Sequence, residues 1–299
     1  MAKRPYILCR YQITDSDDLL DQSGQMQFFQ ENQGQFRPHQ TRADRPQANA
    51  IIQEAEQFTA SRYNAISFFV GYQPGYRTKR GYDPRSHKRT AEVVQDDNIK
   101  SAHIVAVPSL GCMAIEDRTG EHNVPQGTAV NALRSIVRAV FDEGDLNVTH
   151  LTDDDVRRIS REWDLIQYDY VVRPLNPIRP SDFSELRSEK MKIDHVAMDA
   201  GRLLPADGES IQDNGGLFTE TELVVNAGYG QSGGRAITPE GQEARFPRPK
   251  FHMNKEKNFA EREKSRFLKI LFDVSDDGVP DHAGIARTLV QFYRNANTS

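Results

Sequence analysis

The chain has 299 residues, of which 37% are hydrophobic, 27% charged and 9% aromatic. This length allows one large domain or two modest ones, and the composition excludes collagen-like, low-complexity and wholly disordered proteins. The sequence has no apolar run of about 18 residues and no apolar stretch directly behind its first five residues, so we expect neither a membrane span nor a secretory signal.

The charge is distributed unevenly. The net charge is −5, from 38 Lys and Arg against 43 Asp and Glu. Residues 71–89 carry six cations and only Asp83 as an anion, which gives a local charge of +5. Residues 235–269 carry ten cations and five Glu, again +5, so the rest of the chain sums to −15. Such an asymmetry is typical of proteins that use defined basic segments to bind a polyanion.

The first hundred residues read as a β-rich region with a polar insertion and a basic loop. In chain order we expect a strand at 5–13, a polar loop or insertion at 14–49, a short helix at 50–58, a buried strand at 65–70 and a Gly- and Pro-rich basic loop at 71–89. The boundary of this region falls near residue 100, unless the chain forms a single domain.

Residues 101–173 show the clearest periodicity. We expect a hairpin at 103–108 and 112–117, an amphipathic helix at 130–141, a strand at 146–151, a helix at 152–163 and a strand at 165–173. Pro125 lies near the start of the amphipathic helix and Gly144 just past its end, which are the positions where Pro and Gly are enriched in helices. This order of elements would build a split-βαβ-like layer.

Residues 174–299 complete the second region, 101–299. We expect a helix at 181–203, a strand at 217–225, a glycine-rich turn at 228–234, a strand at 267–274 and a helix at 285–294. Strands and helices mix without strict alternation, so the predicted fold class is α+β, with mixed or antiparallel sheets and packed helices.

The basic loop has the residue types of a nucleic-acid contact. Cations neutralise phosphates, tyrosine rings stack on bases, and glycines allow a close backbone approach. The candidate residues are Tyr72, Tyr76, Arg77, Lys79, Arg80, Tyr82, Arg85, Lys88 and Arg89. A solvated surface loop would have the same composition, so this alternative stays open.

A second candidate strip lies at Arg245, Arg248 and Lys250, which alternate with Phe and Pro residues. The cations that follow, in KEKNFAEREKSR, alternate with Glu along an expected helix. Pairing within that helix would neutralise much of their charge, so the shorter strip is the better candidate.

A glycine-rich motif suggests an alternative function. Gly230–Gly234 reads GQSGG and resembles the GDSGG around the nucleophile of chymotrypsin-like serine proteases, with Gln231 in place of Asp. This resemblance would make Ser232 the nucleophile, with His103 as base and Asp145 as its partner. A glycine-rich turn is the simpler interpretation, because helical patterns lie where that all-β family has strands.

The sequence predicts no metal site and no cofactor. Asp273, Ser275 and Asp277 match half of an EF-hand loop, but Gly284 occupies the position where a Glu ligand is needed. Cys9 and Cys112 lie in apolar runs, which indicates small buried thiols in a reducing, cytoplasmic setting.

These patterns favour a non-enzymatic nucleic-acid-binding protein with weak sequence specificity, because no reading module such as a helix-turn-helix is present. An accessory factor of a mobile element or of a phage-defence system would fit, and a homodimer would place two basic segments along one DNA or RNA. The alternatives are a regulatory subunit that binds an acidic protein partner and a serine hydrolase built on Ser232.

Overall fold

The computed structural model divides the chain into two compact units, residues 1–150 with 272–299 and residues 151–271. It describes residues 3–16, 18–39, 48–83, 88–96, 98–120, 122–150, 163–172, 199–225, 230–247, 267–275, 278 and 280–296. Within these residues an antiparallel sheet is combined with four α-helices, which confirms the α+β class. The helix expected at 152–163, which a split-βαβ layer in 101–173 would need, lies outside the described residues.

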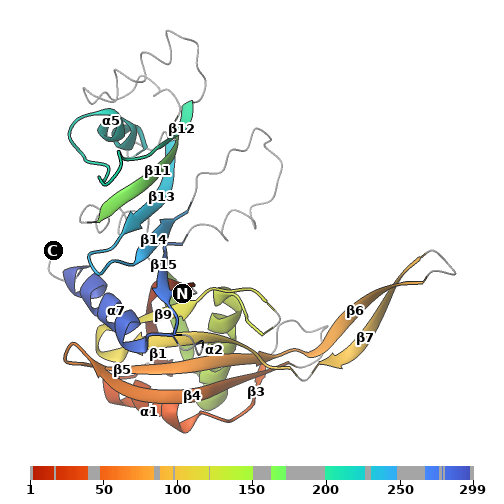
Figure 1. The fold of residues 1–299 in the computed structure, drawn as a ribbon. Coiled ribbons are helices and arrows are strands. Elements are labelled where there is room, and N and C mark those ends of the chain that lie inside the picture. The colour runs from red at the N-terminus through yellow and green to blue at the C-terminus, as the bar shows by residue number, and fades with distance from the viewer. Residues whose placement is uncertain are drawn as a thin grey trace, which may run out of the picture. The chain divides into compact units, whose positions relative to one another are not determined.

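The first unit is built on an antiparallel sheet with the order β1-β9-β8-β5-β4-β3, and β2 and β10 also pair with β1 (Figure 1). Its strands are β1 (Lys3–Asp15), β2 (Asp18–Leu19), β3 (Arg37–His39), β4 (Ala48–Ala60), β5 (Tyr63–Gln73), β8 (Lys100–Val107), β9 (Cys112–Glu116) and β10 (Asp145–His150). A 3-10 turn at Pro108–Leu110 and Gly111, which has a φ of 57°, join β8 to β9. The predicted hairpin at 103–117 is therefore confirmed.

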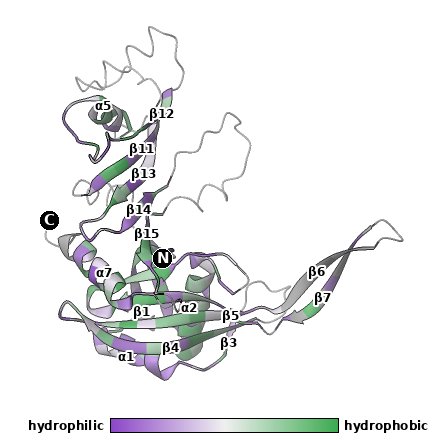
Figure 2. Cartoon of the chain, in the orientation of Figure 1, coloured by the Kyte–Doolittle hydropathy of each residue, from purple (hydrophilic) through white to green (hydrophobic). Residues whose placement is uncertain are grey.

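Two helices cover one face of this sheet, α1 (Gln22–Glu31) and α2 (Gln126–Val140). The apolar stripe of α2 is buried, and Figure 2 shows hydrophobic residues concentrated on α2 and the strands beside it. Ile104 of β8 faces this core, whereas its neighbour His103 belongs to the opposite face, as strand alternation requires. Burying each Leu or Ile side chain contributes roughly 1.5–3 kcal/mol, so the buried side chains of this face stabilise the unit substantially.

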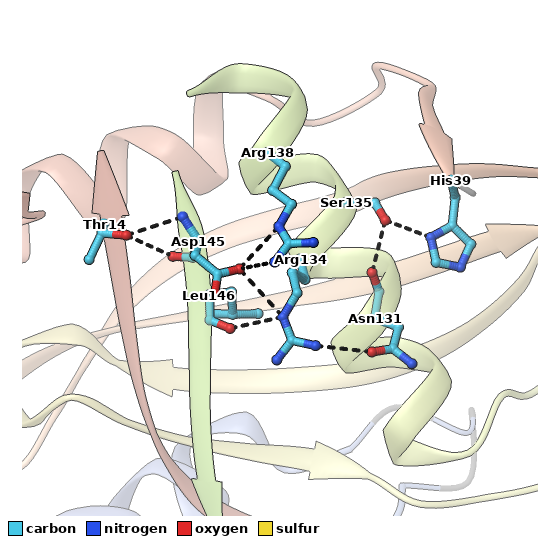
Figure 3. Close-up of polar contacts among 8 residues, drawn as sticks. All are labelled: Thr14, His39, Asn131, Arg134, Ser135, Arg138, Asp145 and Leu146. Atoms are coloured by element: carbon cyan, nitrogen blue, oxygen red, sulfur yellow. Dashed lines mark hydrogen bonds and ion pairs between the residues drawn. The ribbon is translucent and has the colours of Figure 1, made fainter. Parts of the chain in front are cut away.

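The outer side of α2 is attached to β10 by a polar network (Figure 3). Arg138 Nη2 lies 2.9 Å from Asp145 Oδ1, and Arg134 Nε donates to the carbonyl of Leu146 at 3.1 Å. The Asp145 amide donates to Thr14 Oγ1 on β1 at 3.1 Å. Asp145 therefore joins the helix to two strands.

The opposite face of the sheet is covered by α7 (His282–Ala296). Ile285 and Leu289 are fully buried there, and the guanidinium of Arg10 lies over the ring of Tyr293, 5.2 Å from its centroid. The helix predicted at 285–294 is therefore confirmed. No helix among the described residues is long and apolar enough to cross a membrane.

The second unit contains a smaller antiparallel arrangement with the order β12-β11-β13-β14-β15. Its elements are β11 (Asp164–Val172), β12 (Asp199–Leu203), α5 (Leu217–Val224), β13 (Gly230–Ile237), β14 (Glu243–Phe246) and β15 (Lys269–Asp273), of which Phe272 and Asp273 belong to the first unit. Tyr168, Tyr170 and Val172 of β11 form a core with Phe218 of α5 on one face. The alternate residues of β11, Gln167 and Asp169, are polar.

Four predicted elements outside the basic segment and the glycine-rich motif were wrong, because tertiary contacts override the local sequence pattern. Residues 50–58 belong to β4 rather than to a helix, since Ile51 and Ile52 pair with β5. Residues 217–224 form helix α5 instead of a strand, and residues 199–203 form β12 instead of the end of a helix at 181–203. The polar segment 14–49, predicted as a loop or insertion, contains α1 and two short strands, β2 and β3. The Gln-rich α1 forms because Asp21 caps it and Phe28 and Phe29 are buried.

Candidate nucleic-acid interface

The basic segment forms a two-stranded ribbon, β6 (Gly75–Asp83) and β7 (Lys88–Asp96), where the sequence predicted a loop. The strands pair without a register shift from Gly75 opposite Asp96 to Asp83 opposite Lys88. The ribbon is a sheet of its own that continues from β5 and β8, which pair with each other (Figure 1). Gly75 adopts a φ of 71° at the junction, a conformation that favours glycine. Nine residues per strand correspond to a length of about 30 Å.

Pairing distributes the cations of both strands along the ribbon, from Arg77 in the third pair to Lys88 in the last, distal pair. The register sets Lys79 opposite Glu92, Tyr82 opposite Arg89 and Asp83 opposite Lys88. Arg80 lies opposite Ala91 in the same stretch, and the side chain of Arg89 is exposed. The side chains of Tyr76, Arg77, Lys79, Arg80, Tyr82 and Lys88, and all of Arg85, lie outside what the structure describes.

Tyr72 lies apart from the ribbon strands. It is on β5, half-buried, and its ring meets the ring of His39 edge-on with 5.3 Å between centroids. His39 Nδ1 is in turn 2.7 Å from Ser135 Oγ on α2, and burial lowers the pKa of His39 (Figure 3). Tyr72 is thus packed against the core of the first unit.

The second predicted strip is described only at Arg245, because Arg248 and Lys250 lie outside the described residues. Arg245 is on β14 and its Nε donates to Glu243 Oε1 at 2.8 Å. Arg235 on β13 lies directly opposite Arg245, and its Nη1 is 3.8 Å from the same Glu243 oxygen. Sequence reasoning counted Arg235 in the basic segment but did not select it.

Two polar residues of β11, Gln167 and Asp169, extend these contacts of Arg235 to the neighbouring strands. Arg235 Nε donates to Gln167 Oε1 at 2.9 Å, and Gln167 Nε2 donates to Asp169 Oδ2 at 2.7 Å. Arg202 on β12 donates through Nε to Asp169 Oδ1 at 2.6 Å. The signal that could have revealed this chain is the alternation in 164–172, which sets polar residues on the face opposite Tyr168 and Tyr170.

A different polar cluster lies beneath α7 in the first unit. His103 is fully buried, with Tyr6 Oη 2.7 Å from Nδ1 and Ser67 Oγ 2.9 Å from Nε2. The ring of His282 lies 4.8 Å from the ring of His103, centroid to centroid. Burial, helped by His282 and Arg4, lowers the pKa of His103 to about 3, so the imidazole is neutral at pH 7.

A carboxylate completes this cluster. Glu116 is buried, and its Oε2 accepts the backbone N–H of His103 at 3.3 Å. Arg118 Nη1 and Arg4 Nη1 lie 3.3 and 3.5 Å from Glu116 Oε1. Burial, and next the charge of Glu116, raises the pKa of Tyr6 far above its usual value. These groups form a satisfied hydrogen-bond chain under α7.

The contacts of His103 and Asp145 do not assemble a serine-protease triad. Both ring nitrogens of His103 are occupied by Tyr6 and Ser67, and the carboxylate of Asp145 is bound by Arg138 and Arg134. Ser232 is the third residue of strand β13, opposite Tyr170, where the sequence predicted a turn. The nucleophilic serine of an α/β-hydrolase sits on a sharp strand-to-helix turn, and β13 provides none at this position.

Among the described residues, no group of three or more His, Cys, Asp or Glu side chains is arranged to hold a metal ion. Both cysteines are free and buried, and burial raises the pKa of each thiol well above its usual value. The chain matches no protein-family model, and none of the curated proteins is significantly similar to it in sequence.

Proposed function

We propose that the protein binds nucleic acid through the β6–β7 ribbon, with weak sequence specificity. The observation that supports this proposal is the nine-pair register, which distributes cations of both strands along one ribbon, from its third pair to its distal end. A two-stranded β-ribbon fits the major groove of B-DNA, which is about 12 Å wide. The −15 net charge on the rest of the chain repels phosphates and limits non-specific binding.

The contacts in this proposal are mainly electrostatic. Arg77, Lys79, Arg80, Lys88 and Arg89 contact phosphates, which gives affinity and a steep salt dependence but little base discrimination. Tyr76 and Tyr82 add stacking where bases are unpaired. Binding as a homodimer would double the phosphate contacts, and light scattering of the complex gives the stoichiometry that tests this part.

The experiment is a salt titration of binding to labelled 20-nucleotide single strands and duplexes, DNA and RNA, between 50 and 200 mM NaCl. Wild type is compared with an Arg77/Lys79/Arg80→Ala variant. Loss of three phosphate contacts lowers the slope of log K against log[salt] by up to about 3 and weakens binding at least tenfold.

The matched control removes the same number of charges elsewhere in the first unit, at the exposed Lys3, Arg62 and Arg287, each changed to Ala. It should bind as wild type does. Equal slopes and affinities for wild type and the ribbon variant, or no binding by wild type at low salt, contradict the proposal. Binding to polyglutamate but to no nucleic acid selects a regulatory subunit with an acidic partner.

A further inference from the structure

The polar face of the second unit carries three arginines on three of four adjacent strands. Arg202 is on β12, Arg235 on β13 and Arg245 on β14, and we call these three residues the arginine row. Their side chains are 50%, 39% and 55% exposed. Across β12, β11, β13 and β14, strands spaced about 4.8 Å apart, the row spans about 14 Å.

Arg235 and Arg245 are direct cross-strand partners. Like charges in that position repel each other, and the repulsion destabilises the sheet unless anions lie nearby. The row has Asp169 beside Arg202 and Glu243 shared by the other two, so three guanidiniums face two carboxylates. Glu243 does not neutralise both of its arginines, and this end of the row keeps a net positive charge.

A hydrogen bond at the Nε–H edge holds each guanidinium in a fixed orientation. Each arginine donates its Nε–H to a side-chain oxygen: Asp169 for Arg202, Gln167 for Arg235 and Glu243 for Arg245. The Nη groups of Arg202 and Arg245 donate no hydrogen bond to any residue that the structure describes. Those outer N–H groups form a planar fork, which matches phosphate oxygens in bidentate fashion.

The base of the row is rigid. Gln167 and Asp169 are 2% and 7% exposed, and the Gln167 amide is fixed because it accepts from Arg235 and donates to Asp169. Beside it, Gly234 approaches β11 so closely that an added Cβ would lie 2.0 Å from the carbonyl oxygen of Gln167. A rigid base limits the entropy that the arginines lose when a ligand binds.

We propose that the arginine row is a second surface for nucleic acid, which takes the phosphate backbone of one strand. Charge complementarity and the extent of the row carry the choice, because guanidiniums on three of four adjacent strands extend over about 14 Å, and the linked phosphates of a polynucleotide can contact several of them at once. An isolated phosphate would occupy only one fork. The proposal concerns a surface separate from the β6–β7 ribbon and does not depend on it.

The test uses the full-length chain with four variants and a labelled 20-nucleotide single strand. Arg202→Gln/Arg245→Gln should weaken binding at least fivefold and lower the salt slope by about 1.4, because about 0.7 is lost per phosphate contact. Glu243→Gln should tighten binding several-fold, since it frees both of its arginines. Arg245→Lys keeps the charge without the fork and should fall between wild type and an Arg245→Gln variant.

Unchanged affinity and slope in the double variant overturn the proposal, as does weaker binding by Glu243→Gln. Unchanged thermal unfolding midpoints show that the exposed substitutions leave the fold intact, and the gain expected for Glu243→Gln cannot arise from misfolding. If the double variant loses binding to polyglutamate but not to DNA or RNA, the occupant is an acidic polypeptide and the proposal is wrong. Loss of affinity in the row variants supports the arginine row whether or not the ribbon variant binds as wild type does. Loss of affinity in the ribbon variant alone supports only the ribbon, so the two proposals are tested separately.

Discussion

The hydrogen-bond network around His103 in the first unit and the arginine row in the second unit are both polar networks on sheet faces. They differ in how exposed they are and in how many of their polar groups have partners. Under α7, both nitrogens of His103 have partners and the charged form is suppressed. Across β12–β14, guanidiniums keep outer N–H groups that no described residue accepts. A network that is complete and buried stabilises the fold, whereas one that is anchored and exposed is available to a ligand.

The largest expected effect is a pH dependence of stability from His103. Its folded pKa, about 3, lies below the ordinary 6.5, so between these values the unfolded chain binds more protons. Stability therefore rises with pH from about 3 to 6.5 and is lost as pH falls, by at most about 5 kcal/mol. Burial also lowers the pKa of His282, which adds to the same trend.

Urea unfolding at pH 4, 5, 6 and 7 measures this dependence. A His103→Gln variant keeps a hydrogen-bonding side chain without a titrating group, so its curve should be flatter than that of wild type. A wild-type curve that is flat between pH 4 and 6.5 would show that His103 is not buried as a neutral group.

Gly234→Ala should be the most destabilising single methyl addition in the second unit, by about 3 kcal/mol or more. The Cβ would lie 2.0 Å from the Gln167 carbonyl oxygen, and the φ of 152° is one that L-residues rarely adopt. Gly127→Ala in α2, where nothing lies within 4 Å, is the control and should be neutral or slightly stabilising. Equal effects of the two substitutions on thermal unfolding would mean that β13 and β11 are less closely packed than described.

Tyr6→Phe should cost about 1–3 kcal/mol, because it leaves His103 Nδ1 without its partner in a fully buried site. Chemical denaturation gives the free energy of unfolding. Phe58→Tyr, which adds a hydroxyl on the same side of the sheet near His282, is a useful control for aromatic packing. A cost below about 0.5 kcal/mol for Tyr6→Phe would mean that His103 Nδ1 finds another partner, such as a water molecule, when the Tyr6 hydroxyl is removed.

Arg245→Ala should change the free energy of unfolding by less than about 1 kcal/mol, because its ion pair with Glu243 is half-exposed. The same denaturation experiment measures it. A larger loss would make the arginine row a stabilising network like that around His103, and the contrast between the two would disappear.

The local sequence pattern was sufficient to predict an element where residues close in sequence are also close in space. The hairpin β8–β9 and the amphipathic α2 follow from alternation and helical spacing within 103–141. Alternation in 164–172 marks the polar face of β11, but it does not show which arginines lie beside that face, because strand register pairs residue 167 with 235, and 235 with 245. The ribbon was anticipated as a basic segment, but its glycines and Pro84 were interpreted as loop signals, and the strand-favouring Val93 and Val94 lie outside that segment, in β7.

The first unit is discontinuous in sequence, since residues 272–299 return to it after the second unit. During synthesis, the sheet face around Tyr6 and His103 therefore emerges without the helix that covers it. At 5–20 residues per second, the ribosome needs on the order of ten seconds to translate the intervening segment. Throughout that interval the nascent chain presents an uncovered aromatic sheet surface, which is the kind of surface that chaperones bind.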